Sequence, residues 1–239
     1  MVSMIDQNIR TLIRNEINKI VNKPSLKLDQ QQKADGSWVT AIDHGLTRAV
    51  EKLLRSHFPD VAIVSEEGSH ELLFPCFILD PVDGTSGLIH NTGECSLSLA
   101  YMHSGRIDDE LNSAYIAHIF SDFEVHQDMH LPVNSTATSF GLVSRSEWKK
   151  GLYEQGQHAG KSVQPLGSIA LKLAHLAYGN AAFVVTLRPK SIWDIAAGSI
   201  LLNRLGISLW HHHDKIEQLD RIKLNGPMLW ATHSDLKEL

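Results

Sequence analysis

The sequence has little of what marks secreted, membrane or disulfide-bonded proteins. Its 239 residues include only two cysteines, Cys76 and Cys95, and both lie in apolar segments. Two cysteines are too few for a disulfide framework, so we expect buried free thiols in a reducing compartment. The first residues show no basic segment followed by an apolar run, and no uncharged stretch has the roughly 18 residues that a membrane helix needs. We therefore expect a cytoplasmic protein without a signal peptide or a membrane span.

Runs of basic residues are absent as well. The formal net charge is −5 and no cluster of lysine and arginine stands out, which disfavours binding to a nucleic-acid polymer. Zinc is not expected either, because H-E-x-x-H and paired C-x-x-C do not occur and adjacent residues of the run His211–His213 would point to opposite faces of a strand. Hydrophobic residues make up 43% and charged residues 21%, as in ordinary globular proteins, so the chain can bury one large core or two small ones.

Hydrophobic periodicity predicts helices followed by β-rich segments in the first half of the chain, and strands that alternate with helices in the second half. The first half is expected to contain helices at 5–21 and 42–54, a polar loop at 26–36, strands at 61–64 and 77–79, and β-rich segments at 95–103 and 112–126. The second half is expected to contain strands at 140–144, 181–187, 206–210 and 228–232, and helices at 168–178 and 193–205. The polar segment 127–138 suggests a boundary, which divides the chain into an N-terminal α+β half (1–130) and a C-terminal α/β half (131–239).

The stretch 77–86 is the most informative part of the sequence. Three apolar residues predict a short buried strand, which leads directly into Asp80 and Asp83. Pro81 has no N–H and should end the sheet pairing, while Gly84 permits a sharp turn before a helix start. Divalent cations prefer carboxylate and carbonyl oxygens, and helix N-termini favour phosphate, so a metal-assisted phosphoryl site is one interpretation. An Asx turn with an ordinary helix cap explains the same residues about equally well.

Several other polar residues could belong to a functional site, but each alone is explained by a more common structural role. Glu66 follows a short strand as the central acids do, although a surface position is the commoner role for a glutamate. Asp43 and Asp194 lie at helix starts, where an aspartate is most often a cap. Lys33 lies in the polar loop, where lysines are usually solvated, and Gly167–Ser168 before an apolar helix is a weak signal for an anion site.

The order of these residues along the chain resembles that of one known family. The segments Lys33, 39–43, 65–67, 80–86 and 193–198 follow one another as in the inositol monophosphatase-like phosphatases, which are magnesium-dependent and lithium-sensitive. The signatures D-P-x-D-G-[ST]-[ST] and W-D-x-A-A-G carry the resemblance, and it runs over most of the chain. It implies a layered αβαβα sandwich of the inositol monophosphatase/fructose-1,6-bisphosphatase type, often assembled as a homodimer.

The resemblance also implies a role for each matched residue. Two or three Mg²⁺ ions would be bound by Glu66, Asp80, the carbonyl of Val82, Asp83 and Asp194. The residues that act on the attacking water would be Asp43 and Thr85, together with Glu66. Substrate contacts would come from Lys33, Gly84, Thr85, Gly167 and Ser168.

One departure from the family pattern bears on the substrate. Inositol-specific members carry a glutamate shortly before the W-D aspartate, where this chain has Leu187, followed by Arg188 and Lys190. A leucine cannot accept hydrogen bonds from sugar hydroxyls, whereas Arg188 would favour a second anionic group on the substrate. We expect a Mg²⁺-dependent phosphomonoesterase that uses a metal-activated water on a small phosphorylated metabolite, such as inositol monophosphate or a sugar phosphate. The alternatives are a 3′(2′),5′-bisphosphate nucleotidase and, in another class, a non-catalytic regulatory protein that binds metal and phosphate.

Overall fold

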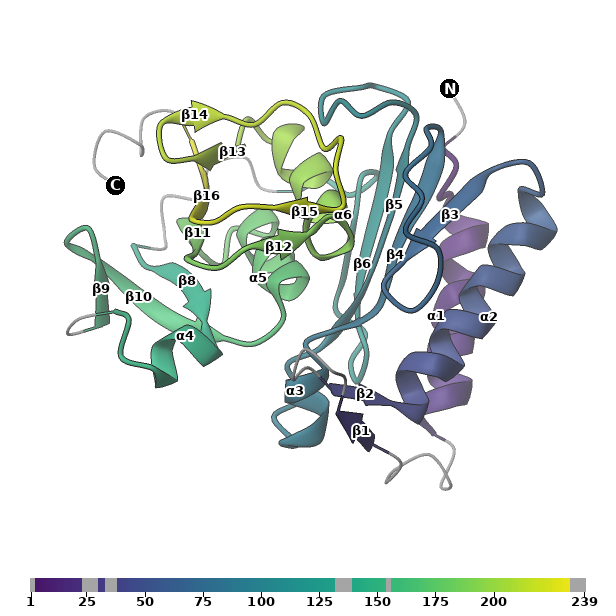
Figure 1. Ribbon diagram of the computed structural model, residues 1–239, viewed down its shortest axis with the longest axis horizontal. Helices are drawn as coiled ribbons and strands as arrows, with labels where there is room; N and C mark the ends of the chain where they lie inside the picture. The colour runs from purple at the N-terminus through teal and green to yellow at the C-terminus, as the bar shows by residue number, and fades with distance from the viewer. Residues whose placement is uncertain (1–2, 23–29, 33–37, 132–138, 154–155, 233–239) are drawn as a thin grey trace.

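The chain folds into alternating layers of helix and sheet. The computed structural model describes residues 3–22, 30–32, 38–131, 139–153 and 156–232 (Figure 1). From right to left in Figure 1, helices α1 (Gln7–Val21) and α2 (Ala41–His57) cover one face of a five-stranded sheet, and α5 (Ile169–Ala177) and α6 (Ile192–Asn203) cover its other face. A seven-stranded sheet and α4 (Arg145–Lys149) complete the stack. The expected αβαβα sandwich is confirmed.

Helices α1 and α2 form where the apolar spacing predicted them. The side chain of Asp6 accepts a first-turn N–H at the start of α1, and Thr40 caps α2 in the same way. Between the two helices, β1 (Gln30–Gln32) and β2 (Trp38–Thr40) pair antiparallel. The expectation of a loop over the whole of 26–36 is therefore wrong at β1, whose three glutamines gave no apolar pattern from which a strand could be predicted.

The five-stranded sheet is buried on both faces. Its strands in spatial order are β3 (Ala62–Ser65), β4 (Cys76–Asp83), β5 (Ser96–Met102), β6 (Ser113–His118) and β7 (Glu124–His126). Strands β3 and β4 are parallel, and the other neighbours are antiparallel. In β4, Phe77 and Leu79 pack with α1 and α2, whereas Ile78 packs with α5 and α6. Because helices cover both faces of the sheet, the first part of this strand is a continuous run of apolar residues.

The seven-stranded sheet takes all its strands from the second half of the chain. In spatial order they are β14 (Asp214–Lys215), β13 (Ser208–His211), β16 (Met228–Ala231), β11 (Phe183–Thr186), β8 (Gly141–Ser144), β10 (Lys161–Leu166) and β9 (Gln157–His158). The remaining elements are the two-stranded ladder of β12 (Lys190–Ser191) with β15 (Lys223–Leu224), and the short helix α3 (Thr85–Ile89) after β4. Strand β8 pairs parallel with both β10 and β11, as strands joined by a helix usually do.

Helices α5 and α6 form the central layer, and most of their residues are buried. One core cluster joins these helices to Ile78 of the five-stranded sheet and to Val184 and Trp230 of the seven-stranded sheet. A separate cluster on the outer face of the second sheet contains Phe183 and packs against Trp148 of α4. A layer covered on both sides needs apolar residues all round, which is why these helices lack a polar face.

The two expected halves, 1–130 and 131–239, share this central layer. The five-stranded sheet lies within the first half and the seven-stranded sheet within the second. The central helices come from the second half but pack against strands of the first. The halves therefore meet across a common core, and their independence as domains stays a prediction.

The sheet pairing of β4 does not end at Pro81 as expected. The β4–β5 register runs to Asp80 opposite Ser98, is interrupted at Pro81 and the next residue, and resumes with Asp83 opposite Ser96. The missing N–H of proline explains the interruption, but a bulge lets the pairing continue beyond it. Both acids therefore belong to the strand.

The packing of α5 against α6 gives a test of stability. A Cβ added to Gly198 of α6 would lie 2.5 Å from the Cβ of Leu173 in α5, whereas one added to Gly45 of α2 would lie 3.4 Å from the Ile20 side chain. Alanine is favoured over glycine inside a helix by about 1 kcal/mol, so Gly45→Ala should keep or raise the free energy of unfolding. In Gly198→Ala, overpacking should outweigh this gain and lower the free energy of unfolding by about 1–3 kcal/mol. Denaturant unfolding measures both variants, and an equal gain in both would contradict the close approach of the two helices.

Candidate metal centre

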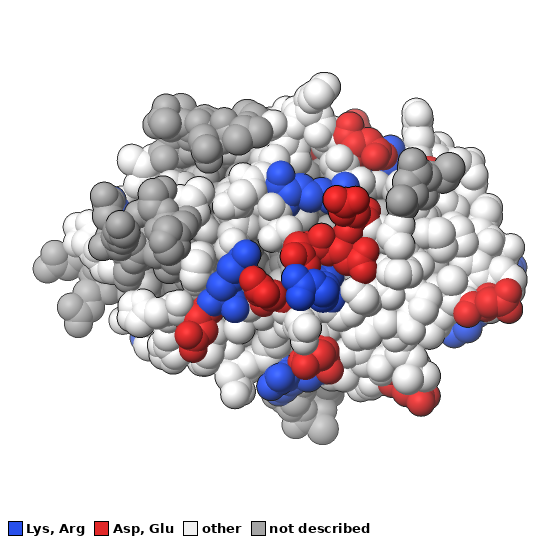
Figure 2. All heavy atoms as spheres, turned by 90° about the horizontal axis from the view of Figure 1, so that it is seen from above, with Lys and Arg blue, Asp and Glu red and all other residues white. Residues whose placement is uncertain are grey.

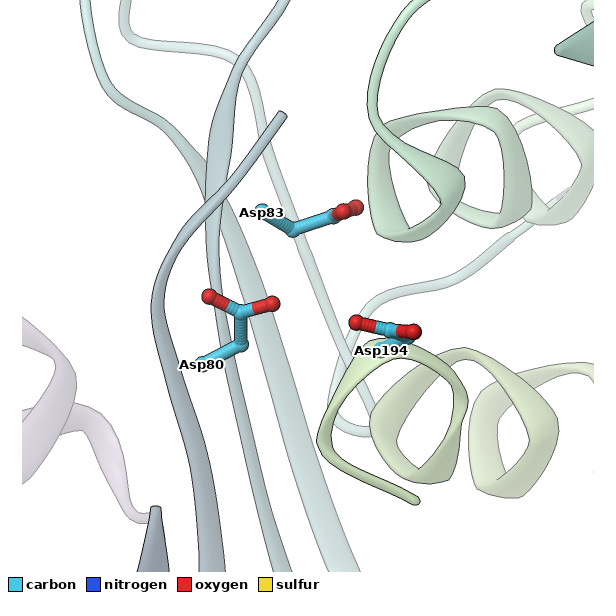
Figure 3. Close-up of side chains that lie close together, drawn as sticks. All are labelled: Asp80, Asp83 and Asp194. Carbon is cyan, nitrogen blue, oxygen red and sulfur yellow. The ribbon is translucent and has the colours of Figure 1, made fainter. Parts of the chain in front are cut away.

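Asp80 and Asp83 lie on the same side of the sheet because β4 is bulged between them. Residues three apart in a regular strand face opposite sides. Here three steps along β4 match two steps along β5, from Ser98 to Ser96, so β4 carries an extra residue. Carboxylate oxygens of Asp80, Asp83 and Asp194 all lie within 4.8 Å of one another (Figure 3). We call these three residues the acidic cluster.

Asp194 reaches the acidic cluster from the first turn of α6. Its Oδ2 accepts the N–H of Ser191 at 2.9 Å, so this aspartate also caps its own helix. The hydroxyl of Ser98 donates to the carbonyl oxygen of Trp193 at 3.1 Å, which ties the start of α6 to β5. From the sequence, Asp194 could be either a helix cap or a site residue. In the folded chain it caps α6 and also belongs to the acidic cluster.

Asp83 is held by the first turn of α5. Its Oδ2 accepts the hydroxyl of Ser168 at 2.6 Å and the N–H of Ala170 at 2.5 Å. In Figure 3 its carboxylate is directed at this helix. Ser168 has a φ of +50°, which is uncommon for a residue with a side chain, and its oxygen also accepts the N–H of Leu171 as the helix cap. The structure thus brings two sequence-predicted site residues, Asp83 and Ser168, into direct contact.

Gly84 must be glycine for two reasons. Its φ of +90° lies in the left-handed region. A Cβ at this position would also lie 2.6 Å from the carbonyl oxygen of Glu94 and 2.9 Å from the Cβ of Ser168. The turn after Asp83 and the turn before α5 are therefore packed directly against each other.

Asp43 and Thr85, which the resemblance pairs, are hydrogen-bonded in the structure. The Oγ1 of Thr85 lies 3.0 Å from Asp43 Oδ1 and 3.1 Å from the carbonyl oxygen of Val82. Asp43 Oδ2 accepts both the N–H of Thr40 at 2.9 Å and its hydroxyl at 2.5 Å. Asp43 is 1% exposed, and burial raises its pKa although these hydrogen bonds act in the opposite direction.

Glu66 and Lys33 are two expected site residues that lie outside the acidic cluster or outside the described part of the chain. Glu66 follows β3, and its N–H donates to the carbonyl oxygen of Leu79 at 3.2 Å, directly before Asp80. Its charge helps to raise the pKa of Asp80, yet its carboxylate is not within the group of three. Lys33 lies outside the described residues.

Glu147, which sequence analysis missed, fixes the loop that carries Arg188. It is 1% exposed, and its Oε1 accepts the N–H groups of Leu187 at 3.0 Å and Arg188 at 3.1 Å and the hydroxyl of Thr186 at 3.1 Å. Its Oε2 accepts the hydroxyl of Tyr153 at 2.6 Å. The Arg188 side chain is exposed and, within the part of the chain that the structure describes, forms no hydrogen bond or ion pair. No local signal marks Glu147, because most of its partners lie about 40 residues away.

Two serines of β5 were also missed. Ser98 holds the start of α6, and the Oγ of Ser96 lies 2.9 Å from the Oγ of Ser168 at the start of α5. Their spacing of two within an apolar strand is the signal that could have found them, since it places both hydroxyls on one face.

The acidic cluster concentrates negative charge where little water reaches it. Asp80 is 1% exposed, and its burial raises its pKa well above the ordinary value, as do the charges of Glu66, Asp83, Asp194 and Asp43. Burial likewise raises the pKa of Asp194 to about 7. Closely spaced carboxylate oxygens fit a hard divalent cation, whose charge would relieve this repulsion.

The described surface mixes charges of both signs. In Figure 2, Lys and Arg side chains lie beside Asp and Glu over the middle of the face seen from above. Among the helices described, none is long and apolar enough to cross a membrane. The expectation that the chain does not bind a nucleic-acid polymer stays a prediction.

Comparisons with known proteins agree with this geometry. The model of the inositol monophosphatase family matches residues 4–238. The fructose-1,6-bisphosphatase/inositol-1-monophosphatase of Thermotoga maritima is 30% identical over 193 residues, 75% of this chain and 74% of that protein. The 3′(2′),5′-bisphosphate nucleotidase CysQ of Escherichia coli K12 is 29% identical over 233 residues, 88% of this chain and 90% of that protein.

Solved structures share the fold. An inositol monophosphatase of Thermotoga maritima superposes with a TM-score of 0.75 at 24% identity, over 95% of this chain and 92% of that one. A structure described as an inositol monophosphatase/NADP phosphatase complexed with Mg²⁺ and phosphate gives a TM-score of 0.71 at 17% identity, over 97% and 92% of the two chains. The layered arrangement is therefore common to this chain and to proteins of distant sequence.

The raised pKa of Asp194 predicts how the metal-free protein responds to pH. An unfolded aspartate titrates near pH ~4, while the folded value is about 7, so the folded state holds this proton more tightly. The contribution of Asp194 to stability is therefore present at low pH and is lost as pH rises from about 4 to about 7. In chelator, Asp194→Asn should remove this loss of stability. Near neutral pH its melting temperature should exceed that of wild type by at least about 2 °C, the shift expected for 1 kcal/mol. Thermal unfolding from pH 4.5 to 8 measures it, with the exposed Asp60→Asn as control; parallel profiles for all three proteins would refute it.

Proposed function

Because this chain belongs to the inositol monophosphatase family, a family of phosphatases, we propose that it uses Mg²⁺ to hydrolyse a phosphate monoester of a small metabolite. The observation that carries the proposal is the convergence of Asp80, Asp83 and Asp194 within 4.8 Å. Asp80 and Asp83 are buried and Asp194 is half-buried, and three carboxylates at this spacing strain the fold unless a cation offsets their charge. The donor set consists of oxygen atoms only, which suits Mg²⁺ rather than a softer metal.

The Mg²⁺ ligands are assigned to the acidic cluster, with Glu66 and the carbonyl of Val82 as further donors. When bound, Mg²⁺ would neutralise charge on the phosphoryl group and lower the pKa of a water molecule. Two or three ions per site follow from the family resemblance, as does inhibition by Li⁺. The position of Val82 supports the assignment, because its carbonyl lies beside Thr85 at the end of the same strand that supplies Asp80 and Asp83.

Thr85 and Asp43 would orient the water that attacks phosphorus. The two neighbours of the Thr85 hydroxyl, Asp43 Oδ1 and the Val82 carbonyl, are both acceptors. Whichever of them takes the hydroxyl proton, the Thr85 oxygen keeps lone pairs that can accept a hydrogen bond from water. The raised pKa of Asp43 makes it a stronger base than an exposed aspartate, so we assign to it the proton that the water releases through Thr85.

Substrate contacts are proposed at the turns next to the acidic cluster. Gly84 and Thr85 begin α3, whose first N–H groups have no partner within the helix and suit phosphate oxygens. Gly167 and Ser168 already have partners within the protein, so their contact with substrate stays a prediction. The same holds for Lys33, which lies outside the described residues.

A bisphosphate nucleotide is the second candidate substrate. The similarity to CysQ covers 88% of this chain, and Leu187 replaces the glutamate typical of inositol-specific members. Glu147 fixes the backbone of Arg188 while the Arg188 side chain is exposed, and no described residue competes for its guanidinium, which could therefore bind a second phosphate. A non-catalytic regulatory role is less well supported, since binding of metal and phosphate alone would not require the Asp43–Thr85 pair beside the cluster.

We further propose a cytoplasmic homodimer, as the family resemblance implies. Light scattering on the purified chain measures its mass directly. A monomer at all concentrations would refute the dimer and leave the catalytic proposal intact.

Removal of the metal, or of one charge of the acidic cluster, tests the catalytic proposal. Inorganic phosphate should be released from a panel of phosphomonoesters in Mg²⁺, and chelator should abolish the reaction. Asp83→Asn and Asp194→Asn keep the side-chain shape but remove a charge that the cation needs, so kcat should fall about 100-fold or more. The exposed Asp60→Asn is the control and should retain wild-type turnover. Full activity in excess chelator would overturn the proposal.

The Arg188→Ala variant distinguishes the two substrate classes. If Arg188 binds a second phosphate, kcat/KM for a 3′,5′-bisphosphate nucleotide should fall about tenfold or more, equivalent to about 1.4 kcal/mol, while simple monoesters are hydrolysed as before. Lys223→Ala is the matched control. Lys223 is an exposed cation on β15, which pairs with β12, the strand that follows Arg188 in the chain. An equal, small effect on both substrate classes would leave inositol and sugar monophosphates as the better candidates.

A further inference from the structure

Glu94 and Arg145 form an ion pair that the proposed chemistry does not use. The guanidinium donates through Nε and Nη2 to the carboxylate, with Nε 2.6 Å from Oε2, and Nη2 also donates to the carbonyl oxygen of Pro165 at 3.1 Å. The side chains are 16% exposed for Glu94 and 34% exposed for Arg145. Burial alone would raise the pKa of Glu94, but the guanidinium and the Gly167 N–H hold this pKa below its ordinary value, so the pair stays charged.

Glu94 connects the two turns that border the acidic cluster. Its Oε2 accepts the N–H of Gly167, before α5, at 2.8 Å. A Cβ on Gly167 would lie 2.8 Å from that same oxygen, and a Cβ on Gly84 or Gly87 would lie 2.6 Å from the carbonyl oxygen of Glu94. Three glycines thus let the chain close around Glu94, and little space is left for the two turns to move relative to each other.

The turn that Glu94 holds is the turn that holds Asp83. Gly167 directly precedes Ser168, whose φ of +50° is strained and persists only where neighbouring groups fix the backbone. Ser168 and Ala170 donate the hydrogen bonds described for Asp83, and both end on Oδ2. These two hydrogen bonds fix the position of Oδ2 and so restrict the orientation of the whole carboxylate. The hydrogen bond from the Gly167 N–H to Glu94 therefore helps to fix Ser168, and through Ser168 the position of the Asp83 carboxylate.

We propose that Glu94 and Arg145 are positioning residues for the Mg²⁺ site, because they fix the turn that orients Asp83. The inference rests on the proposed function, in which Asp83 is a metal ligand. The ion pair joins the loop before β5 to the start of α4, and so it links the five-stranded sheet to the layers beyond α5. Neither residue belongs to a hydrophobic core cluster, so loosening the pair should weaken metal binding before it weakens the fold.

Mg²⁺ binding to Glu94→Gln and Arg145→Lys, measured by isothermal titration calorimetry, tests this inference without relying on catalysis. Glutamine keeps an acceptor for Gly167 but removes the charge, and lysine keeps the charge but cannot make the two-pronged contact. Each variant should raise the Kd for Mg²⁺ about 10–100-fold, the usual effect of losing a group that orients a metal ligand. The double variant should bind no more weakly than the worse single variant, because both remove the same contact. Saturating Mg²⁺ should restore most of the kcat.

Arg14→Lys and Glu124→Gln are the matched controls. Arg14 Nη2 and Glu124 Oε2 form an ion pair of 3.1 Å with side-chain exposures of 15% and 34%, similar to those of the Glu94–Arg145 pair, but between α1 and β7. These variants should bind Mg²⁺ as wild type does. If the Glu94 and Arg145 variants also bind as wild type does, or lose no more than the controls, the inference is wrong. Absence of Mg²⁺ binding to wild type would instead overturn the proposed function. Thermal unfolding checks each variant, and if Glu94→Gln does not fold, Arg145→Lys decides.

Discussion

Crowding of carboxylates in one buried region is the constraint on which this structure depends. Asp43 and the three residues of the acidic cluster each accept a backbone N–H: Asp43 from Thr40, Asp80 from Val82, Asp83 from Ala170 and Asp194 from Ser191. Three of these donors lie at the starts of α2, α5 and α6, where the helix dipole favours negative charge. The fold brings three helix N-termini to one place, and they offset part of the repulsion that burial strengthens.

The layered arrangement determines where those helix starts can meet. Helix α2 covers one face of the five-stranded sheet and α6 covers the other, so their first turns can approach each other only beyond a strand end. Strand β4 lies between them and ends at Asp83. The bulge at Pro81 then turns two acids of one strand toward α5 and α6. Strand end, bulge and helix starts form one arrangement, and it would fail if any of them were displaced by a residue.

Several alternatives that the sequence left open proved not to exclude each other. Asp43 and Asp194 are helix caps and also lie in or beside the candidate site. Asp83 accepts a helix N–H as well, but from α5 rather than from the short helix that follows it in the chain. Local chemistry alone could not separate these roles, because a helix cap and a metal ligand both use a carboxylate oxygen as the acceptor or donor atom. A second, distant contact is what distinguishes a candidate site residue from a simple cap.

Features that depend on neighbours along the chain could be predicted from the sequence. These are the periodic helices, the apolar strand before Asp80, the helix-start positions of Asp43 and Asp194, and the sharp turn at Gly84. The β4–β5 register, the contact of Ser98 with α6, and the pairing of Glu94 with Arg145, 51 residues away, became visible only in the folded chain. The physical reason is range. Periodicity and capping act within a few residues, whereas a polar side chain finds its partner among groups that only the packed layers bring within about 3 Å.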